Sequence, residues 1–79
     1  MPQDVQRIIA IVCEVGKIRG IQPGDDIYDA GFSSINALQL LMELESAFEV
    51  SIPDDEFINA RSARALYAVI ERLKQEQPV

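Results

Sequence analysis

Apolar residues recur at helical spacings in three long stretches of the chain, and no stretch shows the strict alternation of a β-strand. These stretches cover residues 3–17, 34–48 and 63–75. A shorter helix is predicted over 54–59, because Pro53 suits a helix start and the acidic residues after it favour the positive end of a helix dipole. The predicted fold class is all-α: a small four-helix bundle with a long loop after the first helix.

The second predicted helix carries more apolar residues than one buried face requires. The residues expected in its core-facing stripe are Leu38, Leu41, Leu44 and Phe48. Ile35 and Met42 are expected at partly exposed positions, with ordinary core positions as the alternative. Beyond the last helix, residues 75–79 are expected to fray.

Two serines, Ser33 and Ser34, stand where the long connection over residues 20–33 becomes the second helix. Either hydroxyl can cap the helix. Free backbone N–H groups and the helix dipole at such a position also favour an anion, such as a phosphate ester. The pattern therefore leaves open whether one serine carries a group. The apolar residues expected to anchor the connection onto the helices are Ile27, Tyr28 and Phe32.

The chain of 79 residues is short enough to form one domain, residues 1–79, with a core of modest size. Cys13 is the only cysteine, so no internal disulfide can form. The chain has no histidine, which excludes Ser/His and Cys/His catalytic pairs and leaves carboxylates as the main metal ligands. We therefore expect no catalytic residues, no metal site and no enzymatic activity.

No apolar run is long enough to span a bilayer, and charged residues interrupt the first 20 positions, unlike a signal peptide. We therefore expect a cytoplasmic protein without membrane insertion. Nine of the 13 acidic residues lie between Gly20 and Ala60, a stretch without Lys or Arg. This acidic middle argues against nucleic-acid binding and favours basic protein partners, with ordinary solvated surface charge as the alternative.

The residues around the serine pair resemble the acyl carrier protein family. Asp29-Ala30-Gly31-Phe32-Ser33-Ser34-Ile35 is similar to the family signature Asp-Leu-Gly-x-Asp-Ser-Leu at the head of its second helix. Leu44-Glu45-Ser46-Ala47-Phe48 and Ile52-Pro53-Asp54 match the Leu-Glu-x-x-Phe ending and the Ile-Pro-Asp linker. The match is close over residues 27–55, and the flanking helices fit in length and order.

The resemblance implies an acyl-carrier-like four-helix bundle with 4′-phosphopantetheine attached covalently to Ser34. Acyl or aminoacyl groups would then travel as thioesters on this arm. Ser33 stands where the family usually has Asp, which departs from the signature and bears on transferase preference, although a serine still caps a helix. Asn36 and Gln39 replace acids that are usual in fatty-acid carriers, so an aminoacyl or otherwise specialised cargo is expected. Fatty-acid-like, polyketide, nonribosomal peptide and aminoacyl pathways all stay open.

The partners implied by this resemblance are a phosphopantetheinyl transferase, a loading ligase or transferase, and downstream synthase enzymes with basic docking surfaces. The expected partner-binding residues are Ser33, Ile35, Met42, Glu43, Glu45 and Glu49. We expect the protein to act as a stand-alone monomer. The alternative is a helical protein-interaction module that is never modified, in which both serines act only as caps.

Overall fold

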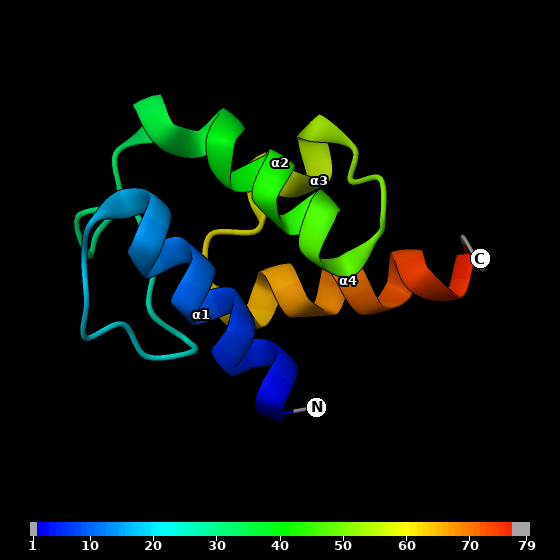
Figure 1. The fold of residues 1–79 in the computed structure, drawn as a ribbon, viewed down its shortest axis with the longest axis horizontal. Helices are drawn as coiled ribbons and strands as arrows, with labels where there is room; N and C mark the ends of the chain where they lie inside the picture. The colour runs from blue at the N-terminus through cyan, green and yellow to red at the C-terminus, as the bar shows by residue number, and fades with distance from the viewer. Residues whose placement is uncertain (1, 77–79) are drawn as a thin grey trace.

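The computed structural model describes residues 2–76, which contain four α-helices, one short 3₁₀ helix and no strand (Figure 1). The elements in chain order are α1 (Pro2–Gly16), η1 (Ser34–Asn36), α2 (Ala37–Phe48), α3 (Asp54–Asn59) and α4 (Ala63–Glu76). The all-α prediction is confirmed. Gln75 and Glu76, which were expected to fray, are helical, whereas residues 77–79 lie outside the described residues.

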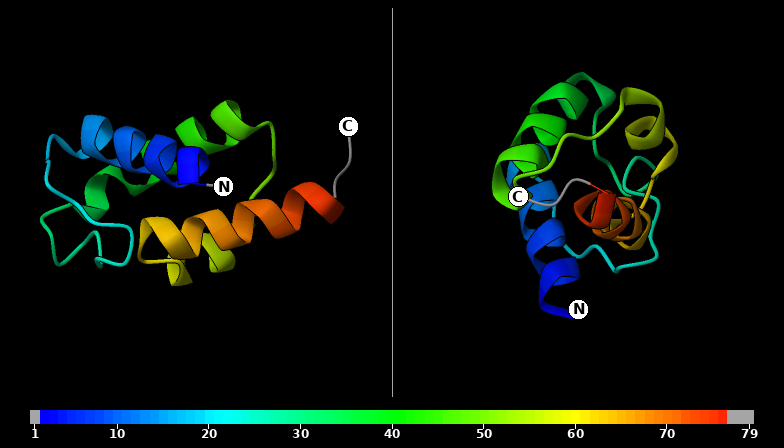
Figure 2. Two further views of the ribbon diagram at one scale, coloured as in Figure 1. Left: turned by 90° about the horizontal axis from the view of Figure 1, so that it is seen from below. Right: turned by 90° about the vertical axis from the view of Figure 1, so that its right-hand side faces the viewer.

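Helix α1 packs against both α2 and α4. Figure 2 shows α1 and α2 together on one side of α4. The short helix α3 also packs against α4. The long loop after α1 crosses the end of the bundle before it reaches η1 (Figure 1). The head of η1 therefore lies at the same end of the molecule as this loop.

The core consists of apolar side chains from every α-helix and from the connecting loops. Its largest fully buried members are Ile8, Val12, Ile27, Leu40, Leu44, Leu66 and Ile70. The core positions predicted for Leu41, Leu44 and Phe48 are confirmed. Ile27 and Phe32 are buried and Tyr28 is half-buried, so the loop is anchored as predicted.

The prediction that Leu38 lies in the core is wrong, because its side chain is 67% exposed. The buried residues of α2 are Leu40, Leu41, Leu44 and Phe48. Successive residues of an α-helix are about 100° apart, so Leu38, two positions before Leu40, faces nearly the opposite side. The apolar stripe of α2 therefore divides into a buried face and an exposed face.

Two glycines allow Phe32 to reach its buried position at the end of the loop. A Cβ on Gly16 would lie 2.5 Å from the Phe32 ring, so only glycine lets the end of α1 approach this ring. Gly31 has a φ of +113°, a conformation that L side chains rarely adopt. Phe32 is thus placed by the backbone directly before the serine pair.

The loop is fastened to the α3–α4 junction through Asp26 and Arg61. The backbone N–H of Ile27 donates to the Arg61 carbonyl at 2.8 Å. Arg61 Nε donates to Asp26 Oδ2 at 2.6 Å, and the same carboxylate accepts the backbone N–H groups of Tyr28 and Asp29 through Oδ1. A single carboxylate therefore organises the turn that leads to the serines.

Asp26→Asn is expected to reduce the loss of stability on acidification. The hydrogen bond from Arg61 lowers the pKa of Asp26, so its contribution is present above about pH 4 and is lost as the pH falls through the lowered folded-state value. Asn does not titrate. Urea unfolding at about pH 6 and about pH 3 should give a smaller stability difference for Asp26→Asn than for wild type, with exposed Asp29→Asn as the control. Equal differences in all three proteins would contradict this role.

Candidate functional site

Ser33 and Ser34 have different roles at the head of η1. Ser33 is the N-cap residue, with an extended backbone, and its Oγ accepts the backbone N–H of Ile35 at 3.3 Å. The predicted capping role of Ser33 is therefore present in the structure. Ser34 is exposed, and its hydroxyl makes no hydrogen bond to any described residue. The serine with the available hydroxyl is Ser34.

The helix start differs from the regular α-helix predicted from residue 34. Residues 34–36 form a 3₁₀ turn, and α2 proper begins at Ala37. The tighter turn uses the local donors: the N–H of Asn36 donates to Ser33 O, and that of Ala37 donates to Ser34 O. With the Ile35 N–H held by the cap, fewer free backbone donors face an anion here than the sequence suggested.

Exposed apolar side chains lie on η1, α2 and α3. Ile35 is 89% exposed and Met42 is 60% exposed, so neither is a core residue and Ile35 is more exposed than predicted. Leu38 adds a third apolar side chain on α2, and Ile58 of α3 is 63% exposed. We call Ile35 of η1 together with Leu38 and Met42 of α2 the α2 apolar face, since they are spaced by three and four residues, as on one side of a helix.

A cavity of about 390 Å³ opens beside Ser34. Its lining consists of Tyr28, Phe32, Ser34, Ala37, Phe57, Ile58 and Arg61. The rings of Tyr28 and Phe32 meet edge to face at 5.8 Å, and the Arg61 guanidinium lies 4.7 Å from the centre of the Tyr28 ring. We call this space the serine cavity. No local sequence pattern predicts this cavity, because its walls come from the loop, η1, α2, α3 and the α3–α4 junction.

The three predicted partner-binding acids lie in different surroundings. Glu45 Oε2 accepts the backbone N–H of Ile52 at 2.8 Å, so this carboxylate holds the linker after α2. Glu43 is exposed and borders a shallow cavity against α1. Glu49 is the exposed C-cap of α2, with a left-handed backbone. The structure gives Glu45 an internal contact and does not bring Glu43 and Glu49 to one cavity.

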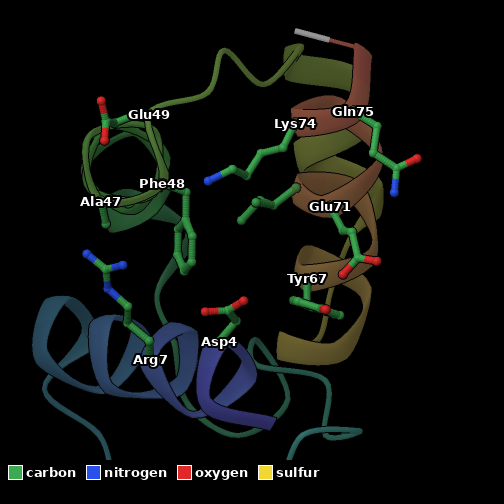
Figure 3. A pocket seen from close by; sticks show the side chains of 10 residues that line it. Asp4, Arg7, Ala47, Phe48, Glu49, Tyr67, Glu71, Lys74 and Gln75 are labelled. Carbon is green, nitrogen blue, oxygen red and sulfur yellow. The ribbon is translucent and has the colours of Figure 1, made fainter. Parts of the chain in front are cut away.

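Another cavity, of about 430 Å³, lies between α1, the end of α2 and α4. Figure 3 shows side chains from these helices around it, including Asp4, Phe48, Tyr67 and Lys74. Neither serine lines this cavity. Among residues 2–76, no group of three or more His, Cys, Asp or Glu side chains is arranged to hold a metal ion. No helix in this part of the chain is long and apolar enough to cross a membrane.

The structure is thus a small four-helix bundle with an exposed serine at the head of η1. The family described as phosphopantetheine attachment site matches residues 6–70. The chain therefore belongs to this family, the acyl carrier proteins, and its cofactor is phosphopantetheine.

Several carrier proteins are similar to this chain. The meromycolate extension acyl carrier protein of Mycobacterium tuberculosis is 26% identical over 99% of this chain and 74% of its own length. An acyl carrier protein of Helicobacter pylori is 32% identical over 68% and 69% of the two chains. An aminoacyl carrier protein of Agrobacterium fabrum is 35% identical over 62% and 58%.

A solved structure also shares the fold. It is a docking-domain complex of the Pax nonribosomal peptide synthetase, PaxA T1-CDD with PaxB NDD, and its matching chain aligns with a TM-score of 0.84 at 23% identity. The alignment covers 95% of this chain and 72% of the other. At this identity the comparison shows the architecture.

Proposed function

We propose that this protein carries acyl or aminoacyl intermediates as thioesters on a 4′-phosphopantetheine arm attached to Ser34 Oγ. The observation that carries the proposal is the contrast between the serines: Ser33 Oγ is used as a cap, whereas Ser34 Oγ is exposed and makes no internal hydrogen bond. A hydroxyl that must enter another enzyme's active site has to be free in this way.

Attachment at Ser34 requires chemistry that the partner enzyme supplies. Ser34 Oγ forms a bond to the phosphorus of the pantetheine phosphate, the pyrophosphate bond of coenzyme A breaks, and adenosine bisphosphate leaves. The serine proton passes to a base of the transferase. When attached, the arm supplies the thiol that forms a thioester. This chain positions the hydroxyl and needs no general base of its own, which agrees with the absence of histidine.

We propose that the α2 apolar face docks the transferase, the loading enzyme and the later synthase enzymes. Ile35 adjoins the attachment serine, and Leu38 and Met42 follow it along the helix. These side chains offer apolar surface that the core does not use. The neighbouring Asn36 and Gln39 are uncharged. Contact at this face therefore depends on apolar burial, and we assign contacts with basic partner residues to the exposed acids Glu43 and Glu49.

Leu38→Ser is expected to lower the kcat/KM of the transferase about ten-fold, the effect of losing one central interface side chain. The fold should be retained because Leu38 is 67% exposed. Gln39→Ser, at the next exposed position, is the matched control and should leave the rate within about two-fold. The defect of Leu38→Ser should persist at high ionic strength, because salt screens charge pairs more than apolar contacts. Equal rates for both variants would remove Leu38 from the docking face.

Intact mass after incubation with coenzyme A and a broad-specificity phosphopantetheinyl transferase tests the proposed function. The wild-type protein should gain the mass of one phosphopantetheine. A folded protein that gains no mass with several transferases would overturn the proposal and favour the unmodified interaction module.

A further inference from the structure

We infer that the serine cavity holds the first part of the phosphopantetheine arm, with the Arg61 guanidinium paired to its phosphodiester. This inference rests on the proposed attachment at Ser34. Ser34 itself lines the cavity, so the groups nearest the serine must begin at its mouth. These groups are the phosphodiester and the quaternary carbon with its methyl groups. The thiol and its cargo lie many bonds further along.

The apolar walls of the cavity match the methyl-bearing carbon. Phe32 and Phe57 are buried and form fixed aromatic surface, while Ala37 leaves room beside the serine. Ile58 belongs to α3, a helix of six residues that packs on α4, and its side chain is 63% exposed. A branched apolar group from the arm would cover part of Ile58 and remove this surface from water.

The cation in the cavity wall matches the phosphodiester. Arg61 is the one Lys or Arg among the cavity-lining residues, and the stretch from Gly20 to Ala60 contains none. Asp26 engages Nε at 2.6 Å and Nη2 at 3.4 Å, so it fixes the plane of the guanidinium. Nη1 makes no hydrogen bond within residues 2–76 and remains a donor for a phosphate oxygen.

The neighbours of Arg61 keep it charged and in place. The hydrogen bond to Asp26 raises the pKa of Arg61, and the Tyr28 ring lies against the guanidinium at 4.7 Å. Burial raises the pKa of the Tyr28 phenol, so this wall stays neutral. Asp26 is thus a positioning residue for Arg61, and the contact with the arm is assigned to Arg61 itself.

Nuclear magnetic resonance of the protein before and after attachment tests this inference. In the attached form, nuclear Overhauser effects are expected from the arm methyl groups to the Ile58 methyls and the Phe57 ring. The amide signals of Phe57, Ile58 and Arg61 should shift together with those near Ser34. Shifts confined to the serine and its sequence neighbours, without these Overhauser effects, would overturn the inference and show a solvated arm.

Two variants separate the contacts. Arg61→Gln should change the ³¹P shift of the phosphodiester toward that of a free ester, whereas Arg64→Gln, an arginine outside the cavity lining, should leave it unchanged. An unchanged ³¹P shift in Arg61→Gln would remove Arg61 from the assignment. Because Arg61→Gln also breaks the pair with Asp26, Ile58→Ser provides a second test that leaves this pair intact. It should weaken the Overhauser effects between the arm methyl groups and the Phe57 ring, and unchanged effects would remove Ile58 from the assignment.

The inference and the proposed function fail differently. If intact mass shows no attachment to wild type, the proposed function fails. If attachment occurs at Ser34 and neither the Overhauser effects nor the ³¹P difference appears, the carrier function stands and the cavity assignment falls.

Discussion

Replacing Ser34 with alanine is expected to abolish the gain of one phosphopantetheine mass completely. The substitution removes the one oxygen that forms the phosphodiester bond, so no residual rate is expected from Ser34 itself. The fold should be unaffected, because the Ser34 side chain is exposed and makes no hydrogen bond to a described residue. Intact mass after prolonged incubation with coenzyme A and transferase measures the result, and circular dichroism checks the helix content.

Ser33→Ala is the matched control for this experiment. It removes the cap to the Ile35 N–H, a bond of 3.3 Å, and is expected to cost about 0.5–1 kcal/mol of stability. It should still gain the full mass. If Ser34→Ala were modified and Ser33→Ala were not, the attachment point would be Ser33. The assignment of Ser34 as the modified serine would then be wrong.

The sequence predicted the parts of the site that lie close together along the chain. The serine pair and the cap follow from one short segment at a helix start. The exposure of Ile35 and Met42 was predicted with core positions as the alternative, and the structure decides for exposure. The serine cavity could not be predicted in this way. Ser34 and Arg61 are far apart in sequence, and only the folding of the loop onto the α3–α4 junction brings them to one cavity.

The fold was predictable as far as local patterns determine it. Helical spacing and the serine pair indicated where the helices lie. The structure adds a cap at α4, where Ser62 Oγ accepts the Ala65 N–H. Which apolar residues of α2 are buried was not fixed by spacing, because its stripe is wider than its contact with the bundle. The hydrogen bond from the Ile52 N–H to the Glu45 carboxylate could not be predicted from the sequence either, because it depends on the path of the linker after α2.

Leu44→Ala is expected to destabilise the protein by about 2–5 kcal/mol, because it leaves a cavity in the core where Leu44 is fully buried. Domains of this kind have a total stability of roughly 5–15 kcal/mol, so the variant should be close to unfolding at 37 °C. Urea unfolding followed by circular dichroism measures the change.

Leu38→Ala, six residues earlier and 67% exposed, is the control with the same chemical change in the same region of the chain. It should alter the free energy of unfolding by no more than about 0.5 kcal/mol, because removing a solvated side chain leaves no cavity. The two variants separate the faces of α2: loss of the buried leucine should weaken the fold, and loss of the exposed one should affect docking alone. A comparable destabilisation by both would show that Leu38 is packed, and the α2 apolar face would then lose its central residue.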